Sequence, residues 1–239
     1  MVDINTFEIA QLVGQSDEHI ADVAELGCRI HKSIVAPLLQ LRDAGMQHGF
    51  QLAVASGYRD YARQHQIWNE KVRGQRPVLD DKGQSIDLSV LDDWHKVQAI
   101  LRWSALPGAS RHHWGTEVDV YDVAAMPSGY QLQLDIAETR VGGVFENFHR
   151  WLDSQLASDQ YFGFFRPYDI DRGGVAPEPW HLSYAPLALR CQRTMDRTVI
   201  ATALERSTLL LKDEVLRHLD EIFDRFIAIP EHCYPAAVS

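Results

Sequence analysis

Two segments of the chain hold residues whose types and spacing could do chemistry. The first runs from Ser110 to Asp119 (SRHHWGTEVD), and the second runs from Glu178 to His181 (EPWH). Together they offer a histidine, a carboxylate and a second histidine as metal ligands, with Glu178 as an additional acid. A catalytic zinc ion usually takes three such protein ligands and keeps a fourth position for water, whose pKa it lowers to about 7. The two segments therefore predict a hydrolytic zinc site.

The residues around Asp119 are typical of a β-strand. Polar and β-branched side chains alternate over residues 117–122, which places Glu117 and Asp119 on the same face of the predicted strand. Residues 180–184 can form a second short strand, because the prolines near it stand at its ends, where proline is tolerated. Two neighbouring strands could then present Asp119 and His181 to one metal ion.

At these residues the sequence resembles the LAS metallopeptidases, named for lysostaphin, the D-Ala-D-Ala metallopeptidases and the signalling domain of sonic hedgehog. It is most similar to the vancomycin-resistance-type D,D-carboxypeptidases and D,D-dipeptidases. Three motifs are matched in the family's order along residues 50–186. They fall on Ser56, Gly57, Tyr58, Arg59 and Gln64, then on Ser110, His112, Gly115 and Asp119, and last on Glu178, Trp180 and His181.

The resemblance implies a role for each motif residue. His112, Asp119 and His181 would bind one zinc ion per chain, and the spacing to Asp119 selects His112 over the adjacent His113. Glu178 would be the general base. Arg59 would stabilise the oxyanion of the tetrahedral intermediate, as a fixed cation near developing negative charge can. We assign His113 to support of the site or to the lining of the cleft, and five residues to substrate binding: Tyr58, Gln64, Ser110, Glu117 and Trp180.

Glu117 departs from the family pattern, which usually has Ala two residues before the Asp ligand. Side chains at i and i+2 of a strand share a face, so Glu117 should lie on the zinc side. Three interpretations stay open for its carboxylate. It could accept a hydrogen bond that orients a ligand histidine, contact a substrate amine, or be paired with an arginine without a catalytic part.

We therefore predict a hydrolase, a zinc metallopeptidase of D-Ala-D-Ala carboxypeptidase type. Its substrate would be a peptide ending in D-amino acids, such as a peptidoglycan stem peptide or a cell-wall precursor. A D,D-dipeptidase or a peptidoglycan endopeptidase of the same fold is an alternative, because the cleavage position depends on which end of the cleft is blocked.

Two other classes of protein could also use two histidines and a carboxylate. A non-haem iron oxygenase does so. Its first His and its carboxylate normally stand two positions apart, whereas His112 and Asp119 stand seven positions apart. A non-enzymatic zinc-binding module like the hedgehog signalling domain would need neither Glu178 nor Arg59.

The composition narrows the class of protein further. The chain has 239 residues, a net charge of -10 and three cysteines far apart in the sequence. No window approaches the run of about 18 apolar residues that marks a membrane span, so we predict none. The negative charge disfavours nucleic acid, whose affinity depends on Lys and Arg at phosphates. An odd number of separated cysteines argues against a disulfide framework.

The first residues bear on the compartment. Residues 1–7 (MVDINTF) carry an acid where a secretion signal carries Lys or Arg, and they lack a continuous apolar core. The chain as written is therefore predicted to be cytoplasmic. A periplasmic location stays open if the N-terminus is incomplete.

The elements that must position the site predict an α+β fold, with a small antiparallel sheet flanked by N-terminal helices and a helical C-terminal extension. We expect helices over the first fifty residues, with a further helix from Pro37 to Gly49. Strands are expected at 51–55 and 162–165, helices at 60–72, 92–103 and 144–156, and a loop that could carry specificity at 75–82.

Residues 1–186 would form the zinc D,D-peptidase-like domain, and residues 187–239 a helical extension packed on it. An apolar stripe predicts one amphipathic helix in this extension, and it consists of Val215, Leu216, Leu219, Ile222, Phe223 and Phe226. The ordinary expectation is that the stripe packs on its own domain, and a homodimer contact is the alternative.

Overall fold

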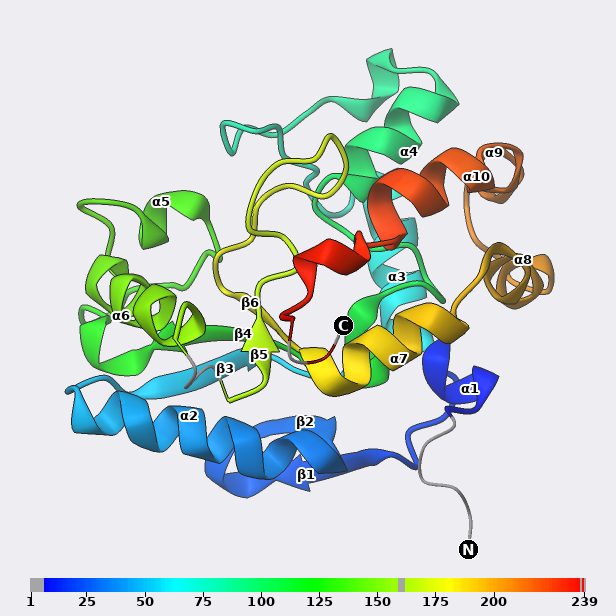
Figure 1. Ribbon diagram of the computed structural model, residues 1–239. Coiled ribbons are helices and arrows are strands. Elements are labelled where there is room, and N and C mark those ends of the chain that lie inside the picture. Colours follow the sequence, from blue (N-terminus) through cyan, green and yellow to red (C-terminus); the bar gives the residue numbers. More distant parts are fainter. Residues whose placement is uncertain (1–6, 159–161, 237, 239) are drawn as a thin grey trace, which may run out of the picture.

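A four-stranded antiparallel sheet lies at the centre of the molecule (Figure 1). The structure is a computed structural model that describes residues 7–158, 162–236 and 238. The strand order is β3-β4-β6-β5, and the strands are β3 (Leu52–Ser56), β4 (Glu117–Asp122), β6 (His181–Tyr184) and β5 (Phe164–Phe165). Helices surround this small sheet, so the predicted α+β fold class is confirmed.

The two faces of β4 differ in chemistry. Val118 and Val120 are fully buried in an apolar cluster, as the alternating pattern predicts for one face of a strand. Asp119 points to the other face, where its Cα partners are His181 on β6 and Ser56 on β3. The sheet therefore has an apolar side that holds it in place and a polar side at the centre of the molecule.

Two helices cover the apolar side of the sheet. Leu38 and Leu41 come from α2 (Val35–Gln47), and Phe148 and Leu152 come from α6 (Glu146–Leu156); all four are buried in the same cluster as the valines of β4. Each of these pairs has the i, i+3 or i, i+4 spacing that puts side chains on one face of a helix. The predicted helices at 37–49 and 144–156 are confirmed with slightly different ends.

The N-terminal region is not the run of helices that its apolar spacing predicts. Only α1 (Ile9–Leu12) precedes a two-stranded antiparallel hairpin of β1 (Ile20–Val23) and β2 (Cys28–His31). The prediction was wrong because Gly27, with φ 62°, adopts a left-handed conformation that ends a short turn of 3-10 helix and turns the chain back on itself. The hairpin and α2 (blue) lie together along one side of the molecule in Figure 1.

Two aspartates begin the helices on the opposite side. Asp60 accepts the Arg63 N–H at the start of α3 (Tyr61–Val72), and Asp92 accepts the His95 N–H at the start of α4 (Asp93–Leu101). The remaining short elements are the helix α5 (Ile136–Thr139) and 3-10 turns at Ala24–Leu26, Lys32–Ile34, Leu88–Val90, Arg111–Trp114, Val123–Ala125 and Glu231–Cys233.

The C-terminal residues form four short helices rather than one long one. They are α7 (Ala185–Thr194), α8 (Arg197–Glu205), α9 (Lys212–Arg217) and α10 (Leu219–Ile222), followed by a π-helical turn at Phe223–Ile227. The predicted single amphipathic helix breaks at His218, whose φ of -105° and ψ of 18° are not helical. The stripe nevertheless packs within the chain, with Val215 and Ile222 fully buried. The homodimer stays a prediction.

Three further expectations concern the chain as a whole. Cys28, Cys191 and Cys233 are all free thiols, as expected from their number. Among the described residues, no helix is long and apolar enough to cross a membrane. The segment that we read for a secretion signal lies almost wholly in residues 1–6, outside the described part of the chain.

Candidate active site

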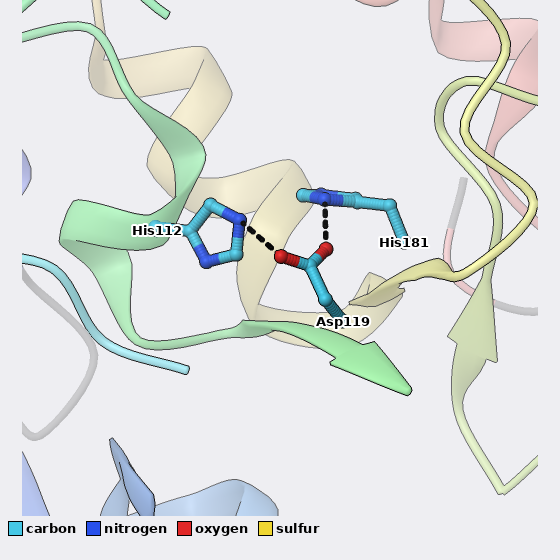
Figure 2. Close-up of side chains that lie close together, drawn as sticks. All are labelled: His112, Asp119 and His181. Atoms are coloured by element: carbon cyan, nitrogen blue, oxygen red, sulfur yellow. Dashed lines mark hydrogen bonds and ion pairs between the residues drawn. The ribbon is translucent and has the colours of Figure 1, made fainter. Parts of the chain in front are cut away.

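The structure brings the three predicted metal ligands together. His112, Asp119 and His181 are buried, and each offers a ligand atom within 4.8 Å of the other two. Figure 2 shows the Asp119 carboxylate between the two rings. The Asp119 oxygens lie 3.5 Å from His112 Nε2 and 3.1 Å from His181 Nδ1. This is a set of two imidazoles and one carboxylate that could hold a metal ion.

Strand pairing and a tight turn place these three side chains. Asp119 and His181 face each other across the β4–β6 ladder, where opposed side chains lie on the same face. His112 reaches them from the 3-10 turn that precedes β4. Gly115 ends this turn with φ 68°, and a Cβ atom on it would lie 2.8 Å from the His31 backbone nitrogen. Only glycine fits that position, which lets the chain enter β4 directly after His112.

The hydrogen bonds of His112 leave one ring nitrogen available to a metal. Its Nδ1 lies 2.7 Å from the carbonyl oxygen of Gly57, which can only accept, so Nδ1 carries the proton. Burial lowers the pKa of His112 to about 3, so the ring is neutral. Nε2 therefore presents a lone pair toward Asp119. A ring held in this way through its other nitrogen is typical of metal-binding histidines.

His181 is held through the other ring nitrogen, Nε2. Its Nε2 lies 2.9 Å from an oxygen of Glu117, which fixes a proton on that nitrogen and leaves Nδ1 facing Asp119 and Glu178. Burial alone would lower the pKa of His181, but its hydrogen bonds to the carboxylates of Asp119 and Glu117 raise it to about 10. The surroundings of Nδ1 therefore favour a cation, whether a proton or a metal ion.

Glu117 links His181 to a buried arginine. Its side chain is 0% exposed, and it accepts hydrogen bonds from Ser183 Oγ at 2.8 Å and Thr116 Oγ1 at 3.0 Å. Arg111 Nη2 lies 3.3 Å away. Burial would raise the pKa of Glu117, but Arg111 and His181 hold it at about 2, so the carboxylate is ionised. The structure thus combines two of the three interpretations: Glu117 is paired with an arginine and also accepts from a predicted ligand.

Arg111 is itself held by the C-terminal part of the chain. Its Nη1 donates to Tyr234 Oη at 3.2 Å and to Gln192 Oε1 at 3.3 Å, and Nη2 donates to Ser183 Oγ at 2.8 Å. The guanidinium also lies over the Trp114 ring, 4.7 Å from its centre. Every described partner is polar or aromatic, which is what a fully buried guanidinium requires.

Glu178 is placed beside the triad by a tight turn. The His181 N–H donates to the Glu178 carbonyl oxygen at 3.0 Å, and one carboxylate oxygen lies 3.5 Å from His181 Nδ1. Burial raises the pKa of Glu178 to about 7, with Asp119 adding to the rise and His181 opposing it. A carboxyl group with a near-neutral pKa can both take and return a proton, which suits a general base.

Arg59 lies in the short segment that joins β3 to α3. Its Nη1 donates to Gln64 Oε1 and its Nη2 to Ser56 Oγ, both at 2.9 Å. The Arg59 N–H donates to the His112 carbonyl oxygen at 3.1 Å, which couples the backbones of the two motifs. The guanidinium is thereby fixed at a cavity that also exposes Asp119 and Glu178.

His113 supports Arg59 rather than the metal. Its Nδ1 donates to the Arg59 carbonyl oxygen at 2.6 Å, and its Nε2 accepts the Gly108 N–H at 3.1 Å. Burial lowers the pKa of His113 to about 4, which keeps the ring neutral and able to do both. The ring is fully buried, and the structure places it outside the group of possible ligands.

A cavity of about 450 Å³ opens onto the triad, a size within the usual range for small-ligand sites. Of the five residues predicted to bind substrate, Ser110 and Trp180 line this cavity. The structure does not bring Tyr58, Gln64 or Glu117 to the lining. Gln64 holds Arg59, Glu117 holds His181, and Tyr58 donates to the Ser16 carbonyl oxygen at 3.4 Å.

The sequence reasoning missed three residues of the site. Tyr168 lines the cavity with its ring centre 5.1 Å from that of His181, and no signal in the sequence marks it. Arg111 lies inside the Ser110–Asp119 segment, and its position shortly before Glu117 could have indicated that the two side chains are paired. Lys71 also lines the cavity. It follows Gln64 by two helical turns, so the helix predicted at 60–72 puts both on one face.

The chain is similar to several known proteins. Residues 27–187 match the model of the VanY family, described as D-alanyl-D-alanine carboxypeptidase. A D-alanyl-D-alanine carboxypeptidase of Enterococcus faecalis is 31% identical over 154 residues, which are 63% of this chain and 46% of that protein. A Haemophilus influenzae protein of uncharacterised function is 44% identical over 98 residues, 40% of this chain and 67% of that one. A structure of VanYB in complex with D-alanine-D-alanine is 26% identical, with a TM-score of 0.48 over 84% of this chain and 90% of that one.

Proposed function

Because the chain belongs to the VanY family of D-alanyl-D-alanine carboxypeptidases, we propose that it is a zinc-dependent peptidase that removes a terminal D-alanine from peptidoglycan stem peptides or their precursors. The observation that carries the proposal is the buried group of His112, Asp119 and His181 with Glu178 beside it. Family membership makes the chain a peptidase. It leaves the iron oxygenase and the non-enzymatic binding module without support.

The donor set fits zinc. Two imidazole nitrogens and one carboxylate are the ligands of many catalytic zinc sites. His112 Nε2 and His181 Nδ1 are the nitrogens that face Asp119, because the other nitrogen of each ring is hydrogen-bonded elsewhere. When bound, zinc would supply a lowered pKa for water and polarisation of the scissile carbonyl.

The chain's own residues would handle the protons and the charge. Glu178 would take a proton from the attacking water and then return it to the leaving amine, since its pKa near 7 permits both directions. Arg59 would hold the oxyanion, because its guanidinium lines the cavity and is already fixed by Gln64 and Ser56. A cation that needs no rearrangement stabilises developing charge best.

Two of the predicted substrate contacts keep this role in the proposal. Ser110 lines the cavity and is 1% exposed, and its hydroxyl has no hydrogen-bond partner among the described residues. A buried hydroxyl without a partner is costly, so it is available to a substrate group. Trp180 would contribute an apolar surface beside it. Gln64 and Glu117 would act through Arg59 and His181.

Product analysis tests the proposal. The zinc-loaded protein is incubated with D-Ala-D-Ala, with a stem pentapeptide ending in D-Ala-D-Ala and with a cross-linked muropeptide, and the products are identified by mass. We expect the pentapeptide to lose a single D-alanine and a chelator to stop the reaction. Release of an intact dipeptide, or cleavage of the cross-link alone, would replace the carboxypeptidase assignment by the dipeptidase or the endopeptidase. Equal rates of hydrolysis with and without metal would refute the proposal that the reaction depends on zinc.

A further inference from the structure

Lys71 is a buried cation in the wall of the active-site cavity. It stands in the last turn of α3, only 9% of its surface is exposed, and it lines the same cavity as Glu178 and Arg59. No carboxylate of the described residues lies within ion-pair distance of it, although most arginines of the described chain have such a partner. A buried ammonium without a counter-ion is costly. Its position therefore calls for an explanation.

The charge of Lys71 interacts with those of other residues that line the cavity. The charges that act on its pKa are those of Glu178, Arg59 and Arg76, and all three residues line the cavity. Burial, together with the positive charge of Arg76, lowers the pKa of Lys71 to about 8. Most Lys71 side chains are therefore still protonated at neutral pH, so the cavity wall carries a positive charge.

Arg76 provides a second cation on the same wall. It follows α3 in the loop over residues 75–82, and only its Nε has a carboxylate partner, Glu70 at 3.2 Å. Its side chain is 40% exposed, and the residue lines the cavity together with Lys71. Arg59, by contrast, already donates to Gln64 and Ser56. Lys71 and Arg76 thus leave donor capacity unused close to the reacting groups.

We propose that Lys71, assisted by Arg76, binds the terminal carboxylate of the peptide substrate and thereby selects chain ends over internal peptide bonds. This inference rests on the proposed function and deepens it, because a buried cation beside the cleavage site rewards a free carboxylate and disfavours a neutral continuing chain. Charge-assisted hydrogen bonds to a carboxylate are the strong ones. Lys71 would be a specificity-determining residue.

The test compares one peptide in two forms. A pentapeptide ending in D-Ala-D-Ala is offered with a free C-terminal carboxylate and as its C-terminal amide, and kcat and KM are measured for both. We expect the wild-type protein to prefer the acid about 10- to 100-fold in kcat/KM, which is the value of one hydrogen bond between charged groups. In Lys71→Met this preference should fall toward one, mainly through a higher KM for the acid.

Matched variants keep the result specific. Lys32→Met removes an exposed lysine that does not line the cavity, and it should leave the preference unchanged. Lys71→Arg restores a cation and should recover part of it, and Arg76→Gln should lower it to a smaller extent. Zinc content and the melting temperature of each variant show whether the fold is kept.

Several outcomes would overturn the inference. If Lys71→Met slowed the acid and the amide equally, Lys71 would act through Glu178 or through the fold. If the wild-type protein cleaved the amide or internal bonds as fast as the acid, the subsite would be wrong while the peptidase function stood. If it cleaved no peptide, the proposed function would fail. In that case calorimetric binding of acetyl-D-alanine and its amide would decide: equal affinity in wild type and Lys71→Met would refute the subsite.

Discussion

The active-site cavity has two walls that are built in different ways. The strand wall consists of His112, Asp119, Glu178 and His181 around β4 and β6, and the helix wall consists of Lys71 and Arg76 at the end of α3 and in the following loop. In the strand wall each histidine has one nitrogen fixed by a hydrogen bond. In the helix wall a buried cation has no fixed partner among the described residues. The side chains proposed to act on the scissile bond are held in place before substrate binds, whereas the cations proposed to recognise the substrate carboxylate keep donors free for it.

The largest effect is expected in the strand wall, from Glu178→Ala. Loss of a general base should lower kcat about 100- to 10,000-fold, while zinc content, measured by elemental analysis, should stay at one ion per chain because Glu178 is not in the ligand group. Glu25→Ala, which removes an exposed acid far from the cavity, is the control. Full activity of Glu178→Ala would refute the role of Glu178 as the general base.

The next largest effect should come from behind the strand wall, at Glu117→Gln. The amide keeps the shape but no longer offers His181 and Arg111 a negative charge. Changing the group that orients a ligand histidine typically lowers metal affinity about 10- to 100-fold. Competition with a chelator of known affinity measures this. Unchanged affinity would mean that Glu117 is only the counter-ion of Arg111.

The dependence of kcat/KM on pH should distinguish the two walls, because Glu178 must be deprotonated to act and Lys71 must be protonated. Glu178 acts as a base only when ionised, and its pKa is raised to about 7 by burial. A bound cation can only lower that pKa, so kcat/KM should fall about tenfold per pH unit below a midpoint at or under pH 7. Lys71 would produce the opposite limb, because binding is lost as its ammonium deprotonates near pH 8. Measurement with the acid and the amide substrate tests this, since only the acid should show the alkaline limb.

The smallest effect is expected farthest from the cavity, at Tyr234→Phe. This change removes a hydroxyl that accepts from Arg111 at 3.2 Å and donates to Gln192 at 3.1 Å. We expect a loss of about 1–2 kcal/mol in the free energy of unfolding, as for one buried hydrogen bond to a charged group. Zinc affinity should fall only a few-fold. Denaturant titration with and without zinc measures both, and a larger loss of affinity than of stability would show direct coupling to His181.

Local patterns predicted where Asp119 and Glu178 lie in the strand wall, whereas the choice of His112 depended on the family resemblance. The alternation over residues 117–122 gives the face of Asp119, and the i, i+3 spacing from Glu178 to His181 gives their proximity. The N-terminal hairpin was mistaken for helix because apolar residues from Ile20 to Ile34 fit both periods, and Gly27 decides between them. A pattern with two readings needs a tertiary partner to resolve it.

The support of the site could not be predicted, because it depends on packing between distant parts of the chain. Tyr234 reaches Arg111 across 123 positions of sequence. No periodicity links two such residues. The function of Glu117 was open for the same reason, since the pattern shows which face it occupies but not which arginine lies there.

The hydrogen bonds from Arg111 to Tyr234 and Gln192 affect the order in which the site can form during synthesis. Both residues lie beyond the part of the chain that matches the family, residues 27–187, and Tyr234 is among the last residues described. During translation the ligands Asp119 and His181 leave the ribosome well before Tyr234 does. The nascent chain can therefore form its sheet early, but Arg111, the cation behind Glu117, gains its last partners only once residues 192 and 234 have been made. The support behind Glu117 is then completed only after both strand-borne ligands, Asp119 and His181, have been made.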